Sequence, residues 1–256
     1  MISDETTSAL WLPFPWEPLP LLPARFVARP NRFIGVFCWD DDPTTTFQAH
    51  IADPGRLQEL LLPNARVWVV DHGPNTHRKL RYTMPLVESP EGQVVSIFSR
   101  LPNAVFIQAL KSGLLEFFRG YTLVKTEPRD PHSTHRFDAL LRSPRHHNPV
   151  WVEVKGASLV ENALALFPDA VTTRGTRQLK ALTTLAQQGH EAWVVFIVQR
   201  PDATAFAPHE QRDPDFARAL HQAHQQGVRV LPIAITLQPG RGVQLQKVLP
   251  VHWVGL

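Results

Sequence analysis

Short apolar segments separated by turn-forming residues fill the chain from Arg25 to about Ser99. The segments are rich in Val, Ile, Phe and Trp, which favour β-strands. In order they read RFVARPNRFIGVFCW, TTTFQAHI, ARVWVVD, LRYTMPLVE and QVVSIF. The breaks between them, DDDP, ADPG, DHGPN and SPEG, contain the residues that favour tight turns. This pattern predicts a small antiparallel β-barrel over residues 25–100.

The stretch before the barrel, residues 8–24, contains five of the chain's 24 prolines among large apolar side chains. Proline lacks a backbone donor and clashes with the preceding turn of a helix, so we expect no helix in this stretch. Residues 1–24 are therefore predicted to be an N-terminal segment that lies extended against a neighbouring surface.

Beyond residue 100 the pattern changes to helical segments that alternate with strands, which is typical of an α/β unit. Helices are expected at 104–111, about 174–188 and 213–226, and strands at 122–127, 136–142, 150–155, 192–199 and 228–235. Asp213 is a candidate N-cap of the last helix, and Gly227 a candidate stop. The chain is thus predicted to have a second domain at residues 101–256.

Composition narrows the class of protein. The 256 residues are 43% hydrophobic, enough to bury two cores, and no apolar run approaches the roughly 18 residues of a membrane span. Acidic residues stand at the N-terminus where a signal peptide would have a basic flank, so we expect a cytoplasmic protein. A single cysteine, Cys38, excludes a disulfide framework. The net charge is +3, and residues 101–256 carry 17 basic against 12 acidic side chains, which favours a polyanionic partner.

The most informative local pattern is HRFDALL, a turn at SPRHHNP, and then VWVEVKG. Glu153 and Lys155 are two apart on an expected strand, so their side chains leave the same face, and a hairpin would bring Asp138 beside Glu153. Two convergent carboxylates suit Mg²⁺ or Mn²⁺, and a lysine can orient or activate a water against a phosphodiester. This is the order of a PD-(D/E)xK nuclease core. The alternative is that these are solvated charges on half-exposed strands. The alternating valines, however, direct the charges inward, where burial is unfavourable unless the charges are paired or bind a ligand.

A series of short motifs supports a family resemblance. In order they are RPNRF, AHIADPGRLQELL, NTHRKLRYT, VSIFSRLPN, HRFDALL, WVEVKGASLVEN, ALFPDAVTTRG and LPV. Over residues 25–251 the chain resembles the sugar fermentation stimulation protein A (SfsA) family of prokaryotes. The resemblance implies an α+β protein of two domains, an OB-fold-like β-barrel followed by an α/β PD-(D/E)xK nuclease-like domain. It also implies DNA binding with little sequence preference and a role in regulating sugar (maltose) metabolism.

Carried over by position, the acidic core of the family falls on Asp138, Glu153 and Lys155, which are the candidate catalytic residues. The candidate ligands of Mg²⁺ or Mn²⁺ are Asp138 and Glu153, with Asp169 in FPDAVTTRG as a further nearby carboxylate. These assignments are what the resemblance implies, and they agree with the spacing of the EVK motif.

The chain departs from the family at three positions. Gln108 stands where the family often has a glutamate, Thr173 replaces another acid, and Gln178 stands where a histidine is common. A site with fewer carboxylates should hold Mg²⁺ less tightly. Two functions therefore stay open: a divalent-metal-dependent nuclease acting on DNA or RNA, and a DNA-binding protein of the same fold that does not cut.

Two basic clusters are candidate nucleic-acid contacts. The first is His77, Arg78, Lys79 and Arg81 in the barrel, where OB-folds bind single strands by groove charges and stacked aromatics. The second is Arg174 and Arg177 at an expected helix start, where free N–H groups attract phosphate. The alternatives are a solvated loop for the first cluster and an ordinary N-cap by Thr172 or Thr173 for the second. The barrel aromatics Trp39, Trp68 and Tyr82 are either stacking platforms or core.

Overall fold

The computed structural model of the chain describes residues 10–53, 57–131, 135–145 and 147–253. The chain divides into two compact units. The first comprises Met1–Leu101 and Thr236–Gln244, and the second comprises Pro102–Ile235 and Leu245–Leu256. No helix in the described residues is long and apolar enough to cross a membrane.

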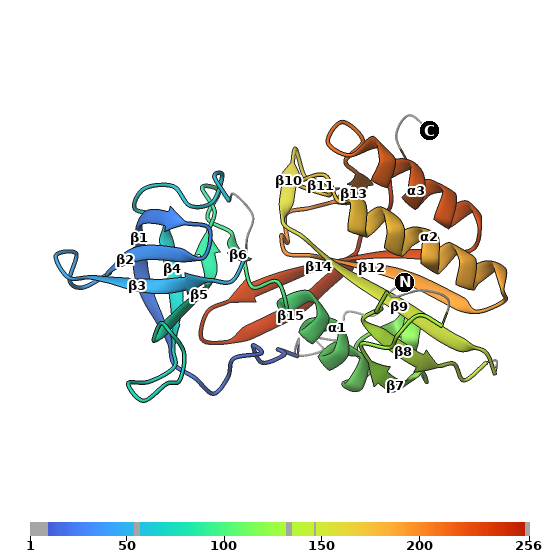
Figure 1. Cartoon of the computed structure of the whole chain (residues 1–256), viewed down its shortest axis with the longest axis horizontal. Helices are drawn as coiled ribbons and strands as arrows, with labels where there is room; N and C mark the ends of the chain where they lie inside the picture. Colours follow the sequence, from blue (N-terminus) through green and yellow to red (C-terminus); the bar gives the residue numbers. More distant parts are fainter. Residues whose placement is uncertain (1–9, 54–56, 132–134, 146, 254–256) are drawn as a thin grey trace, which may run out of the picture. The chain divides into compact units, whose positions relative to one another are not determined.

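The first unit is built from six strands (Figure 1). They are β1 (Leu21–Asn31), β2 (Ile34–Trp39), β3 (Thr46–Ile51), β4 (Arg66–Asp71), β5 (Tyr82–Glu88) and β6 (Val94–Ser96). Their order is β3-β2-β1-β4-β5-β6, with neighbours antiparallel. A further parallel pairing of β3 with β5 closes β1–β5 into a barrel. The OB-fold-like barrel expected from the sequence is therefore confirmed.

Alternating side chains of the barrel strands fill its interior. Phe26 of β1, Phe37 of β2, Ile51 of β3 and Met84 of β5 belong to one buried cluster. The rings of Phe26 and Phe37 meet edge to face with centroids 5.9 Å apart, a favoured geometry for buried aromatics. Buried and more exposed residues largely alternate in β1, β2 and β3, whereas β4 and β5 are buried on both faces over most of their length.

The N-terminal segment contains no helix in its described part, residues 10–24, as expected. The backbone of Leu12 exchanges two hydrogen bonds with Val243, of 2.7 and 2.8 Å, so the segment is tied down by strand-like pairing. Trp16 is buried, stacks on Phe14 and meets Phe98 edge to face. The proline-rich stretch is therefore held by the buried side chains of Leu12, Phe14 and Trp16, whereas residues 17–20, just before β1, are exposed.

The described chain from Leu101 onward contains a six-stranded sheet of order β15-β14-β12-β9-β8-β7, a three-stranded sheet of order β10-β11-β13, and three α-helices (Figure 1). Its strands are β7 (Thr122–Thr126), β8 (Ala139–Arg142), β9 (Pro149–Ala157), β10 (Leu159–Glu161), β11 (Leu164–Phe167), β12 (Glu191–Val198), β13 (Ala205–Pro208), β14 (Arg229–Gln238) and β15 (Gly242–Val248). Its helices are α1 (Leu101–Lys111), the 3-10 turn η1 (Glu116–Phe118), α2 (Thr173–Gln187) and α3 (Pro214–Gln225). β9, β12 and β14 run parallel, whereas β7, β8 and β9 are antiparallel.

Strand β9 is central to the larger sheet, since β8 and β12 pair with its two edges and α2 packs near it. Val150, Val152 and Val154 are buried on one face, and Trp151 and Glu153 are buried on the other. The strand therefore has two buried faces, which is why its apolar residues form a nearly continuous run. A charged residue at such a position is enclosed on all sides.

Several boundaries differ from those expected. The helix expected at residue 104 begins at Leu101, because Pro102 fits the first helical turn, where its missing N–H has no partner to lose. The strand expected at 136–142 is regular only from Ala139, so Asp138 lies just before it. Strands β10, β11, β13 and β15 were not expected, and the first three are only three or four residues long.

Candidate active site

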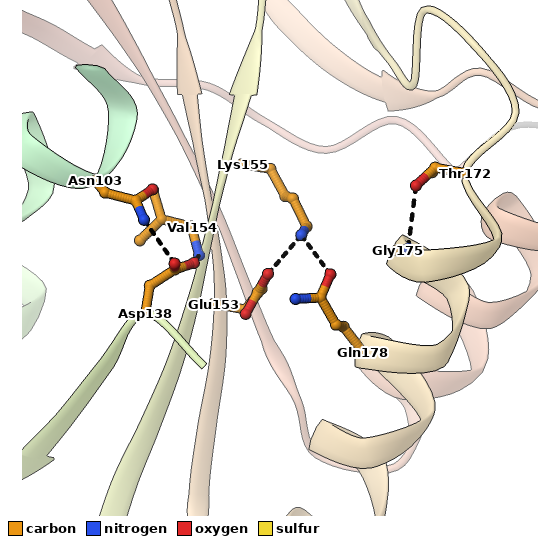
Figure 2. A network of polar contacts seen from close by, with 8 residues as sticks. All are labelled: Asn103, Asp138, Glu153, Val154, Lys155, Thr172, Gly175 and Gln178. Carbon is orange, nitrogen blue, oxygen red and sulfur yellow. Dashed lines mark hydrogen bonds and ion pairs between the residues drawn. The ribbon is translucent and has the colours of Figure 1, made fainter. Parts of the chain in front are cut away.

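The carboxylate of Glu153 is the most deeply enclosed charge of the site. Its side chain is 3% exposed, and its Oε1 accepts a hydrogen bond of 2.5 Å from Nζ of Lys155 (Figure 2). Its Oε2 is buried and has no hydrogen-bond partner in the described structure. Burial raises the pKa of Glu153 to about 7, against the opposing charge of Lys155. One oxygen of this carboxylate therefore remains available to a cation or a proton.

Asp138 lies immediately before β8, where the β8–β9 hairpin places it next to β9. Its backbone N–H donates to the carbonyl oxygen of Val152 at 3.0 Å, which continues the ladder by one residue. Its Oδ2 accepts from the backbone N–H of Val154 at 2.7 Å, and its Oδ1 accepts from Nδ2 of Asn103 at 2.6 Å (Figure 2). A carboxylate has about four lone-pair positions, so two bonds orient Asp138 and leave it able to bind a cation.

The pKa of Asp138 is also raised above its usual range by burial, although the N–H of Val154 and the charge of Lys155 oppose the shift. The charge of Asp138 in turn contributes to the raised pKa of Glu153. A buried acid whose pKa is raised by desolvation and by a neighbouring carboxylate is a recognised mark of functional sites.

Lys155 completes the predicted trio and is oriented by two acceptors. Its Nζ donates to Glu153 and also, at 2.7 Å, to Oε1 of Gln178, a buried residue on α2 (Figure 2). An ammonium group has three donors, so one N–H is left for a water or a phosphate oxygen. Its side chain is 16% exposed, which leaves the tip of the side chain accessible.

The start of α2 lies beside these acids. Thr172 is its N-cap, and Oγ1 accepts from the N–H of Gly175 at 3.1 Å (Figure 2). Arg174 and Arg177 are exposed in the first turns. The charge of Arg174 is among the groups that oppose the raised pKa of Asp138 and of Glu153. The N-cap interpretation is thus confirmed for Thr172, and a phosphate contact by the two arginines stays a prediction.

A buried carboxylate joins the starts of α2 and α3. Oδ2 of Asp213 accepts from the N–H of Thr172 at 2.7 Å, and its Oδ1 caps α3 by accepting from Phe216 at 3.0 Å. Asp213 was expected to cap α3 but not to reach α2. Its position at both helix starts matches the preference of N-termini for negative charge.

Asp169 and Gln108 are the other positions that the sequence singled out near this site. Asp169 is exposed, and among the described residues no three His, Cys, Asp or Glu side chains gather as a possible metal ligand set. Gln108, on α1, has a buried Oε1 without a partner in the described structure. Sequence reasoning missed Asn103 as a site residue, although the LPN motif contains it, and it noted Gln178 only as a departure.

In the barrel, the four predicted basic residues lie in two different environments. Arg81 makes a two-bond pair with Asp71, at 2.7 and 2.6 Å, and lies over the ring of Tyr82. His77, Arg78 and Lys79 are exposed, and the last two line a pocket. The barrel aromatics divide in the same way, since Trp68 is buried and Trp39 and Tyr82 are half-buried. A core position is therefore correct for Trp68.

Comparisons with known proteins cover most of the chain. The family model "SfsA N-terminal OB domain" matches residues 27–97, and "Sugar fermentation stimulation protein RE domain" matches residues 100–241. A sugar fermentation stimulation protein homolog from Moorella thermoacetica is 42% identical over 234 residues, which is 91% of this chain and 97% of that protein. The homolog from Acetivibrio thermocellus is 42% identical over 212 residues, 82% of this chain and 87% of that protein. The solved structure of Pyrococcus furiosus SfsA in complex with Ca²⁺ is 29% identical, with a TM-score of 0.82 over 95% of this chain and 100% of that chain.

Proposed function

The chain belongs to the sugar fermentation stimulation protein A family, and from that premise we propose that it binds DNA and acts on phosphodiesters through a divalent cation. The observation that carries this proposal is the buried Glu153 carboxylate, whose Oε2 has no partner in the described structure. An enclosed ionised carboxylate is unfavourable unless a cation or hydrogen bonds complete it. Asp138 supplies a second oxygen donor nearby, and carboxylate oxygens are the ligands that Mg²⁺ and Mn²⁺ prefer.

The donor set fits such a cation. Asp138 and Glu153 would hold it, because both carry unused lone pairs and both acids are destabilised in their ionised form by burial. The relative from Pyrococcus furiosus was solved in complex with Ca²⁺, another cation that takes oxygen ligands, which supports a divalent cation as a ligand of this fold. The chemistry that bound Mg²⁺ or Mn²⁺ supplies is stabilisation of the negative charge that develops on a phosphodiester.

The other residues of the site have separate tasks. Asn103 and the N–H of Val154 fix the orientation of the Asp138 carboxylate. Gln178 and Glu153 direct Nζ of Lys155, whose third N–H can hold a water or a non-bridging phosphate oxygen. Arg174, exposed at the start of α2, can neutralise a neighbouring phosphate of the same strand.

A second candidate function is DNA binding without cleavage, with an indirect effect on sugar metabolism genes. It is favoured by a specific observation: no third acid joins Asp138 and Glu153 among the described residues. Gln108 and Thr173, where the family often has acids, add no charge. A site with two carboxylates holds a cation less tightly, and weak occupancy would leave a fold that binds and does not cut.

The two candidates are separated by one experiment. Purified protein is incubated with labelled single- and double-stranded DNA and RNA in Mn²⁺ or in EDTA, and bound and cleaved species are resolved on gels. We expect binding that weakens as salt rises, because phosphate contacts release counterions. Cleavage should require Mn²⁺ and should disappear in Asp138→Asn, which keeps the side-chain shape.

The matched control is Asp215→Asn on α3, whose side chain is 76% exposed and pairs with Arg218. This variant should bind and cut as the wild type does. If the wild type binds in both Mn²⁺ and EDTA but cleaves in neither, DNA binding without cleavage is the function that remains. Absence of binding to every nucleic acid would refute both.

A further inference from the structure

A pocket of about 800 Å³ opens on the barrel of the first unit. It lies between the turn that joins β1 to β2, strand β3 and the segment that precedes β5. The lining residues that matter here are Arg32, Phe33, His50, Arg78 and Lys79. Its volume falls within the range of small-ligand sites, roughly 300–1,000 Å³.

One wall of the pocket is aromatic and held in place. Phe33 is 49% exposed although it is a large apolar residue, and it stands in the two-residue turn between β1 and β2. Its N–H donates to Oδ1 of Asn31 at 2.9 Å, and its carbonyl accepts from the N–H of Ile51 at 2.9 Å. Its ring lies nearly parallel to that of His50, at 9° with centroids 6.5 Å apart. A ring on a fixed turn and a second ring on strand β3 offer a stacking surface.

The rest of the described lining combines three cations with apolar and uncharged polar residues. Arg32, Arg78 and Lys79 line it, and none of its lining residues is an acid. Within the described residues none of these three cations forms an ion pair. Burial, aided by the charge of Arg78, lowers the pKa of His50 below its usual range. Arg81, by contrast, is neutralised by Asp71 and lines a different pocket with Asp71 and two further acids.

Uncompensated cations beside an exposed aromatic ring are complementary to a nucleobase that carries phosphate. We propose that this pocket binds one unpaired nucleotide of a nucleic-acid strand, with the base stacked on Phe33 and His50 and the adjoining phosphates on Arg78, Lys79 and Arg32. A base inside a duplex presents only its edges, so this stacking requires a single strand or an unpaired end. The inference rests on the proposed nucleic-acid binding and adds a preference: the barrel binds unpaired strands more tightly than duplex.

The test is binding in EDTA, measured by fluorescence anisotropy with a labelled mixed-sequence single strand and with a hairpin duplex that has no overhang. Removing one stacking ring should weaken single-strand affinity roughly tenfold in Phe33→Ala. Duplex affinity should change by less than about twofold, because the duplex offers no base to this ring. Phe33→Trp should restore single-strand affinity, and melting curves check that each variant folds.

The matched control is Phe117→Ala, since Phe117 is 52% exposed but lies in the second unit. It should leave both affinities unchanged. The double variant Arg78→Ala with Lys79→Ala should lower the affinity for both the single strand and the duplex. It should also reduce the slope of log affinity against log salt for the single strand by about 1.4, at about 0.7 per phosphate contact. Competition by a mononucleotide and by a short single strand distinguishes a free nucleotide from a strand as the ligand, and the strand should compete better.

Equal single-strand affinity of Phe33→Ala and wild type would overturn the inference, as would equal losses on duplex and single strand. In either case the wild type still binds nucleic acid, so the proposed function survives. Failure of the wild type to bind any of the probes would instead refute the proposed function itself. Stronger competition by the mononucleotide would overturn the assignment to a strand.

Discussion

Replacing Glu153 with glutamine keeps the shape of the side chain and removes the titration on which the candidate site depends. In the folded protein the pKa of Glu153 is about 7, because burial disfavours the charged form, whereas an unfolded glutamate titrates at 4.5. Between these pH values the folded state keeps a proton that the unfolded state has released. The stability of the wild type should therefore fall as pH rises through this window and level off above it.

The magnitude follows from the two pKa values. Each pKa unit corresponds to about 1.4 kcal/mol, so ionising Glu153 in the folded state costs about 3 kcal/mol by pH 8. The glutamine variant has no such titration. Relative to wild type, its free energy of unfolding should rise by about 3 kcal/mol between pH 4.5 and pH 8. Changes in packing and hydrogen bonding caused by the substitution are present at both pH values and cancel in this comparison.

The assay is thermal melting of metal-free wild type and Glu153→Gln at pH 5 and pH 8. Between pH 5 and pH 8 the change is about 2.5 kcal/mol, so at roughly 2–4 °C for each kcal/mol the difference in Tm should move by about 5–10 °C in favour of the variant at pH 8. Glu116→Gln, at a side chain that is 85% exposed, is the control and should show no such movement. Millimolar Mn²⁺ should raise the Tm of the wild type at pH 8 and leave Glu153→Gln unchanged. The reasoning is wrong if the Tm difference between variant and wild type is the same at both pH values.

Two further variants test neighbouring parts of the second unit. Lys155→Ala should keep stabilisation by Mn²⁺, since an ammonium is no metal ligand, and should lose cleavage by at least tenfold; loss of the melting shift would contradict this division of roles. Asp213→Ala should lower the free energy of unfolding by about 2 kcal/mol in urea titrations, because it removes the cap of α3 and the acceptor of the Thr172 N–H. Asp215→Ala, exposed in the same helix, should change it by less than about 0.5 kcal/mol.

The central trio of the site could be predicted because its geometry is local. A strand period of two puts Glu153 and Lys155 on one face, and the short turn between β8 and β9 fixes the pairing that brings Asp138 alongside. Asn103 and Gln178 reach the same group from α1 and α2. Their positions depend on how two helices pack against the sheet, and no spacing along the chain encodes that packing.

The barrel illustrates the same limit. Arg78, Lys79 and Arg81 look alike in sequence, yet the β4–β5 register places Asp71 opposite Tyr82 and so next to Arg81. That register contains an irregularity that composition does not reveal. Phe33 and His50 are 17 positions apart and become neighbours only because β2 pairs with β3. Strand existence was therefore predictable, whereas the partners of individual charges and rings were not.

An alternative interpretation is that Lys155 and Glu153 form an ion pair with a purely structural role. The electrostatics of the site argue against this interpretation. An ion pair that stabilises the fold lowers the pKa of its acid, because the neighbouring cation favours the charged form. Here burial outweighs the attraction of Lys155, and the pKa of Glu153 is raised instead. Burying two such charges is often no better than an apolar pair of the same volume. The unpaired Oε2 is the feature that a structural ion pair leaves unexplained, and the proposed cation, which would compete with the proton for that oxygen, accounts for it.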